Sequence, residues 1–118
     1  MPHKKTYTWF KIADDIKEIN TGPGGLAEIT VNGKVICLAV HNSILMACTQ
    51  KCPHAGGVLS HGYLDVLGNI VCPVHRYKFS MQSGRNISGE GYFLKTFPVE
   101  IRTDGVFIGF RENKRFHW

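Results

Sequence analysis

The chain has 118 residues, of which 43% are hydrophobic and 11% aromatic, and its formal net charge is +5 at pH 7. This length fits one domain, residues 1–118, that buries a hydrophobic core. The sequence contains no apolar run of about 18 residues and no apolar signal-peptide core, so we expect no transmembrane helix and a cytoplasmic location. Basic residues gather mainly near the two ends and form no dense basic run interleaved with aromatics, so nucleic-acid binding is not expected.

Taken in order, the chain consists of short apolar or alternating runs separated by turn residues. Asn32-Gly33 and Asp104-Gly105 are typical of tight turns between antiparallel strands, and the first of these predicts a hairpin over residues 26–40. Residues 55–63 read as a loop with a short helical turn. We expect strands over residues 8–11, 26–31, 34–40, 44–49, 69–71, 76–81, 94–102 and 106–110. No long amphipathic helix is predicted, which indicates an all-β sandwich or barrel.

Two short clusters of cysteine and histidine dominate the middle of the chain. Cys52-Pro53-His54 is followed by seventeen residues and then by Cys72-Pro73-Val74-His75. Thiolate and imidazole are metal ligands. A zinc module usually takes two Cys from one cluster and two His from the other, and it stays open as an alternative with a structural role. Here each cluster mixes one Cys with one His, which suits a two-iron centre.

The remaining cysteines and histidines have simpler interpretations. Cys37 and Cys48 lie inside apolar strand-like runs, so we expect buried free thiols rather than a disulfide. The other histidines are scattered along the chain and are expected to be surface or loop residues: His3, His41, His61 and His117.

The ligand spacing resembles the signature of Rieske [2Fe–2S] proteins. This resemblance implies that Cys52 and Cys72 bind the inner iron and that His54 and His75 bind the outer, more exposed iron. It extends from the strand before Cys52 to the closing hairpin that begins at Leu94. It also implies a three-layered antiparallel β-sandwich, with a small cluster-binding subdomain of loops at approximately residues 50–80.

Departures from the family pattern indicate which branch this is. High-potential members have two further cysteines that form a disulfide; the matching positions here are Gly57 and Val74. Those members also place a serine and a tyrosine that donate hydrogen bonds to cluster sulfur, where this chain has Tyr77 and Phe79. Losing such donors lowers the reduction potential, toward roughly −150 mV for Rieske centres. Arg76 replaces a common glycine, and residues 88–91 replace a proline-containing loop that covers the cluster in many members.

The resemblance implies a low-potential, soluble, monomeric one-electron carrier rather than an enzyme. Its redox protein partners would be a flavoprotein reductase and a terminal oxygenase, as for ferredoxin components of ring-hydroxylating dioxygenase systems. The alternative is a small Rieske subunit of a nitrite reductase-like enzyme complex. No dinucleotide-binding glycine motif or supported nucleophile–base pair suggests a substrate site.

Overall fold

The computed structural model describes residues 6–53, 57–74, 76–89 and 91–111. The described chain forms three antiparallel sheets, with strand orders β1-β10-β9, β2-β3-β4-β8 and β5-β6-β7. The strands are β1 (Tyr7–Ala13), β2 (Leu26–Val31), β3 (Lys34–His41), β4 (Ile44–Thr49), β5 (Tyr63–Leu64), β6 (Asn69–Val71), β7 (Lys78–Ser80), β8 (Thr96–Phe97), β9 (Val99–Arg102) and β10 (Gly105–Arg111). Two short 3₁₀ helices, η1 (Ile16–Glu18) and η2 (Leu59–His61), complete the set of described elements.

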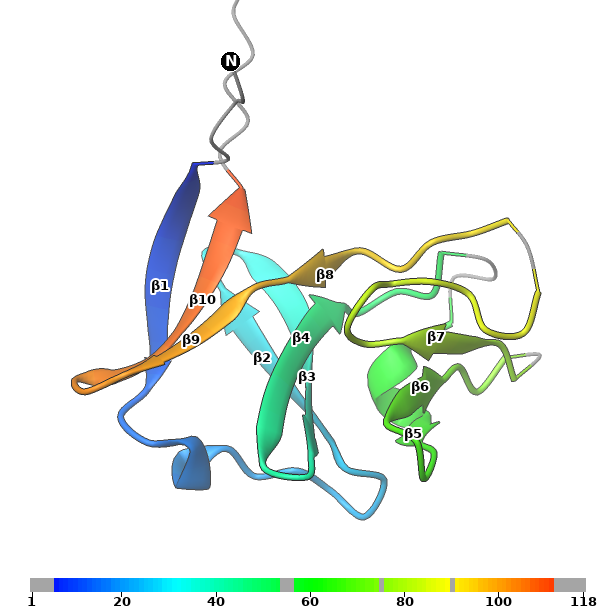
Figure 1. Cartoon of the computed structure of the whole chain (residues 1–118), viewed down its shortest axis with the longest axis horizontal. Coiled ribbons are helices and arrows are strands. Elements are labelled where there is room, and N and C mark those ends of the chain that lie inside the picture. The colour runs from blue at the N-terminus through cyan, green and yellow to red at the C-terminus, as the bar shows by residue number, and fades with distance from the viewer. Residues whose placement is uncertain (1–5, 54–56, 75, 90, 112–118) are drawn as a thin grey trace, which may run out of the picture.

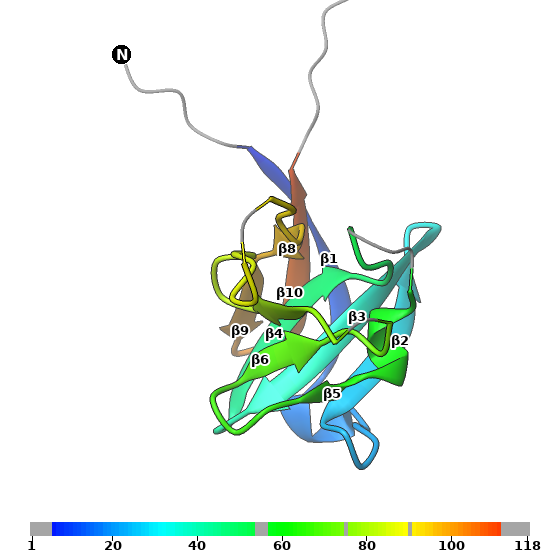
Figure 2. The same ribbon diagram turned by 90° about the vertical axis from the view of Figure 1, so that its right-hand side faces the viewer.

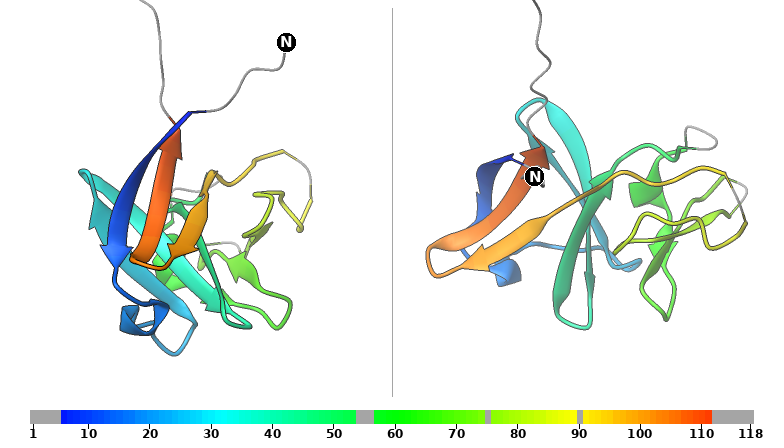
Figure 3. Two further views of the ribbon diagram at one scale, coloured as in Figure 1. Left: turned by 60° about the vertical axis from the view of Figure 1, so that its left-hand side comes forward. Right: turned by 45° about the horizontal axis from the view of Figure 1, so that its top comes forward.

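The three sheets are arranged as successive layers (Figure 1). The four-stranded sheet lies in the middle, with the β1-β10-β9 sheet on one side and the β5-β6-β7 sheet on the other. Figure 2 looks onto the small β5-β6-β7 sheet from outside. Figure 3 shows the yellow part of the chain, which follows β7, returning from that small sheet to the orange strands of the rest of the molecule. The predicted three-layered, all-β architecture is therefore confirmed.

The middle sheet is buried on both faces, which explains the continuous apolar run along β3. Side chains of a strand alternate between the two faces of its sheet. Ile36 and Leu38 accordingly join one core, and Cys37 and Ala39 join the other. The first core lies between the middle sheet and the β1-β10-β9 sheet and includes Val31, Ile36, Leu38, Leu45, Ala47, Val106, Ile108 and Phe110. The second core lies under the β5-β6-β7 sheet.

The hairpin predicted over residues 26–40 is confirmed. β2 pairs with β3 in the expected register, and Asn32 and Gly33 form the connecting turn with φ of 50° and 78°. Positive φ at both central residues is what a type I′ turn requires, and asparagine and glycine tolerate it best.

Two predictions about strands were wrong. Residues 94–102 do not form one strand, because Pro98 divides the segment into β8, which pairs with β4, and β9, which pairs with β10. Proline lacks the N–H that a continuing ladder needs. Tyr63, predicted as the end of a loop, forms β5 together with Leu64 and pairs with β6. No helix in the described part of the chain is long and apolar enough to cross a membrane.

Candidate metal centre

The two predicted ligand loops are built in the same way. The N–H of Cys52 donates to the carbonyl of Gly57 at 2.7 Å, and the N–H of Cys72 donates to the carbonyl of Tyr77 at 2.8 Å. Each loop is flanked by an antiparallel residue pair, Lys51 with Val58 in the first and Val71 with Lys78 in the second. Each cysteine therefore occupies the first position of a hairpin loop that closes five residues later. Cys52 and Cys72 thus occupy equivalent positions in two loops that close in the same way.

The two loop cysteines are buried and lie next to each other. Cys52 is 2% exposed and Cys72 is 0% exposed, and neither is in a disulfide. Burial, together with the contact between the two thiols, raises the pKa of Cys72 to about 11, although a hydrogen bond from the Val74 amide acts in the opposite direction. Two thiols held together away from water form a suitable donor pair for a metal, which stabilises the thiolate form. The predicted ligands His54 and His75 lie outside the described residues.

The two loops touch where the high-potential family branch has its disulfide. A Cβ built on Gly57 would lie 2.7 Å from Cγ2 and 3.3 Å from Cβ of Val74, and 3.1 Å from Sγ of Cys72. Disulfide-bonded residues typically have Cβ atoms about 3.5–4.5 Å apart. Gly57 and Val74 are thus neighbours in space, in agreement with the positions that the resemblance assigned to them. In this chain, van der Waals contact replaces a covalent link.

A second glycine allows the first loop segment to lie against β6. A Cβ on Gly62 would collide with the carbonyl oxygen of Val71, the residue that precedes Cys72. Only glycine permits this approach of two backbones. Gly62 therefore fixes the segment after the first loop against the strand that leads into the second.

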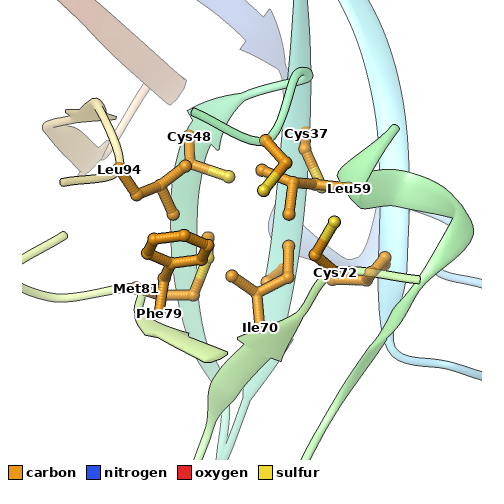
Figure 4. Close-up of a cluster of buried hydrophobic side chains, with 11 residues drawn as sticks. Cys37, Cys48, Leu59, Ile70, Cys72, Phe79, Met81 and Leu94 are labelled. Atoms are coloured by element: carbon orange, nitrogen blue, oxygen red, sulfur yellow. The ribbon is translucent and has the colours of Figure 1, made fainter. Parts of the chain in front are cut away.

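Both loop cysteines belong to a core of buried apolar side chains, in which Figure 4 shows Cys72 beside its neighbours. Phe79 is fully buried in the same core as both loop cysteines. Cys37 and Cys48 also belong to this core; they face each other across β3 and β4. Contact with Cys37 and burial strongly raise the pKa of Cys48. The prediction of two buried free thiols is confirmed.

Polar side chains that the sequence analysis did not single out join the loops to the middle sheet. The Glu28 carboxylate on β2 accepts hydrogen bonds from Ser60 Oγ at 2.6 Å and from Gln50 Nε2 at 2.9 Å. These bonds lower the pKa of Glu28 below its usual value. Gln50 precedes Cys52 by two residues, and Ser60 lies in η2. The three residues lie far apart in the sequence, which gave no signal that they meet.

The turn between β5 and β6 is held from two sides. Asp65 Oδ1 accepts hydrogen bonds at 2.9 Å from the amides of Leu67 and Asn69. Burial alone would raise the pKa of Asp65, but these bonds outweigh it and the pKa is lowered. At the end of β3, His41 Nε2 lies 3.1 Å from the carbonyl oxygen of Val66. In the sequence, an Asp two residues before the residue whose amide it binds is a recognisable sign of a turn. No sequence pattern indicated that His41 would contact this turn.

Other candidate ligands remain separate. His41 contacts the β5–β6 turn, and His61 is exposed at the end of η2, as expected of surface or loop residues. His3 and His117 lie outside the described residues. Among the residues that the structure describes, no group of three or more His, Cys, Asp or Glu side chains is arranged to hold a metal ion.

Comparison with known proteins defines the class to which this fold and thiol pair belong. The model of the Rieske [2Fe-2S] domain family matches residues 8–98. The chain therefore belongs to the Rieske [2Fe–2S] family, and its cofactor is a Rieske-type [2Fe–2S] cluster.

Relatives within the family are ferredoxins. The chain is 30% identical over 106 residues to the ferredoxin component of naphthalene 1,2-dioxygenase/salicylate 5-hydroxylase systems from Ralstonia sp, an alignment that covers 87% of this chain and 96% of that protein. It is 30% identical over 74 residues to the ferredoxin component of an alkene monooxygenase system from Xanthobacter autotrophicus, covering 63% of this chain and 61% of that protein. The chain is accordingly an electron carrier of the ferredoxin type.

Two solved structures share the fold. A complex of reduced oxygenase and oxidised ferredoxin in carbazole 1,9a-dioxygenase matches with a TM-score of 0.70 and 25% identity, over 85% of this chain and 91% of that one. A protein described as the small subunit of an NADH-dependent nitrite reductase from Mycobacterium tuberculosis matches with a TM-score of 0.74 and 16% identity, over 88% of this chain and 96% of that one. The second likeness concerns the fold alone.

Proposed function

We propose that Cys52 and Cys72 bind one iron of the cluster and that His54 and His75 bind the other. The observation that supports this best is the repeated loop geometry, in which two identically closed hairpin loops bring two buried thiols together. The cluster supplies reversible one-electron transfer when bound. Residues of approximately 50–80 then act as a cluster-binding subdomain within a single domain of residues 1–118.

The chain's own residues set the environment of the bound cluster. The buried floor under the loops excludes water, and the Val74 amide donates to the Cys72 sulfur. Such donors stabilise the reduced, more negative cluster and raise its potential. Phe79 has no hydroxyl that could add a further bond. We therefore place the reduction potential at the low end of the Rieske range, near roughly −150 mV.

In this proposal the protein passes single electrons from a flavoprotein reductase to a terminal oxygenase. Two observations support this carrier role. The relatives are ferredoxin components of dioxygenase and monooxygenase systems, and the fold resembles that of a chain in an oxygenase–ferredoxin complex. We also propose that it acts in the cytoplasm as a monomer.

The carrier proposal is tested with catalytic amounts of protein. Purified holoprotein is mixed with a flavoprotein reductase, NADH and an aromatic-ring oxygenase. A carrier supports many turnovers of the oxygenase per ferredoxin chain. Turnover that stops after one electron per chain would contradict the proposal. Size-exclusion chromatography of the same sample tests the monomeric state.

The alternative is a small subunit of a nitrite reductase-like complex, which the shared fold with the Mycobacterium tuberculosis protein keeps open. A subunit of that kind copurifies stoichiometrically with one large partner from its native source. A carrier is released from its partners during purification and elutes alone.

A further inference from the structure

Arg76 has an unusual backbone conformation at the edge of the second ligand loop. Its φ is +56°, in the left-handed region. The other non-glycine residues with positive φ in the described ranges are Asn32, Asn42 and Ser43, which lie in the turns of the two hairpins of the middle sheet. Asparagine adopts this region readily, whereas the Cβ of most other residues meets a steric cost there. Among the positive-φ non-glycine residues of the described ranges, Arg76 is the one with a long, charged side chain.

The loop explains the conformation but not the side chain. The hydrogen bond from Cys72 to the Tyr77 carbonyl closes the loop, and a left-handed residue just before the closing position completes such a turn. Glycine would meet this requirement without strain. The turn therefore does not require the arginine side chain, whose presence needs another explanation. Strained backbone of this kind is often retained at functional sites.

The guanidinium is exposed and available. Arg76 is exposed, and in the described part of the chain no salt bridge involves it. It follows His75 directly in the sequence, and the neighbouring Val74 is 37% exposed. An exposed cation next to a half-exposed apolar side chain is suited to contact with another protein.

The surrounding charge has the same sign. From residue 51 to residue 90 the sequence has two acidic residues, Asp65 and Glu90, and four basic ones: Lys51, Arg76, Lys78 and Arg85. Asp65 is itself engaged by hydrogen bonds within its turn and lies 3.8 Å from Lys78 Nζ. The proposed cluster-binding region is therefore basic, and its electrostatic complement is an acidic surface.

We propose that Arg76 recognises an acidic redox partner, by pairing its guanidinium with a carboxylate on the partner's surface beside the acceptor or donor centre. This inference rests on the proposed electron-carrier function and on the placement of the cluster between the two loops. Arginine suits the role because its planar group binds a carboxylate through two parallel hydrogen bonds. Arg76 is then a specificity residue that holds the partner next to the cluster.

Small redox reagents of opposite charge test this on the holoprotein. Dithionite-reduced protein is oxidised in a stopped-flow instrument by ferricyanide, a trianion, or by tris(phenanthroline)cobalt(III), a trication. The variant Arg76→Gln removes the charge. The matched control is Arg85→Gln, which changes the net charge equally at the opposite end of β7, where the Arg85 carbonyl accepts from Ser80 N–H.

Coulomb's law gives the expected size of the effect. For a trianion that approaches Arg76 to roughly 8 Å, loss of the charge slows ferricyanide oxidation about threefold at 0.1 M ionic strength. The cobalt reagent should react about threefold faster with the same variant. Both effects should fade at 1 M salt, where the Debye length is about 3 Å. Arg85→Gln should change either rate less than about 1.5-fold, because Arg85 lies at the opposite end of β7 and salt screens its charge over the longer distance to the reagent at the cluster.

The outcomes separate this inference from the proposed function. If Arg76→Gln and Arg85→Gln change the two rates equally, or if neither changes them, the role of Arg76 is wrong while the carrier function stands. If the parent protein takes up no electron, both the role of Arg76 and the proposed carrier function are wrong. Arg76→Gly should melt at the same temperature as the parent or higher, because glycine relieves the strained turn. A lower melting temperature would show a structural role for the side chain and overturn the proposal.

Discussion

Replacement of Gly57 by alanine tests the close contact between the two ligand loops. The added methyl would lie 2.7 Å from Val74 Cγ2 and 3.1 Å from Cys72 Sγ. Ordinary carbon–carbon contacts are about 3.5–4.0 Å, so the loops must separate by about 1 Å. Overpacking of this size typically costs about 1–3 kcal/mol, and we expect about 2 kcal/mol for Gly57→Ala. For a chain of this length, this corresponds to a melting temperature about 8 °C lower.

A second substitution identifies the cause. Val74→Ala removes the methyl group that the new side chain would meet, and on its own it should cost about 0.5–1 kcal/mol because Val74 is partly exposed. If steric overlap causes the loss, the double variant is more stable than the sum of the two single effects by about 1.5 kcal/mol. Some cost remains in the double variant because the contact with Cys72 Sγ persists.

The assay is thermal unfolding of the holoprotein, with iron content per chain measured on the same samples. Gly89→Ala is the matched control, since a Cβ at Gly89 would meet nothing within 4 Å and its φ is not in the left-handed region. Strict additivity of Gly57→Ala and Val74→Ala, or an equal loss of stability in Gly89→Ala, would refute the reasoning.

Three further predictions follow from other contacts. The paired substitution of Gly57 and Val74 by cysteine should form a disulfide under mild oxidation, since the Cβ positions, 3.3 Å apart, need to separate only slightly to reach disulfide geometry; mass spectrometry that finds both introduced thiols free would contradict this. Cys37→Ala should keep its full iron content and lose about 1 kcal/mol, because the thiol fills core space without binding metal. Glu28→Gln should be less stable than the parent at pH 7. The folded pKa of Glu28 is lowered, so its stabilising effect is present above about pH 4.5 and is lost as the pH falls through the folded pKa. Equal melting-temperature differences at pH 7 and pH 3 would argue against this role for the carboxylate.

Much of the fold could be predicted because local sequence patterns specify it. The Asn32-Gly33 turn between two apolar runs determines the β2–β3 hairpin and its register. Interruptions inside an apolar run were harder to interpret. Pro98 sends β8 and β9 to different sheets, yet the flanking residues resemble one continuous strand. β5 has only two residues, Tyr63 and Leu64, and its pairing depends on the backbone contact that Gly62 allows.

The candidate metal centre likewise has features that could be predicted from the sequence and features that could not. The cysteine positions were predictable because metal-ligand spacing is visible along the chain, and the structure brings Cys52 and Cys72 together. The supporting hydrogen bonds of Glu28 to Gln50 and Ser60 were not predictable, because they join residues 22 and 32 positions apart on an exposed surface. The left-handed backbone of Arg76 had one sequence signal, the glycine that many family members have at this position, but the dihedral angle itself is set only when the loop closes.

Metal analysis of the purified protein tests the central claim most directly. Iron, acid-labile sulfide and zinc are measured per chain, together with the EPR spectrum after reduction by dithionite. A Rieske-type [2Fe–2S] centre predicts two irons and two sulfides per chain, no zinc, and a signal that appears on reduction. His75→Ala should lose the two-iron cluster in the same assay. One zinc per chain in a colourless, EPR-silent protein would contradict the account.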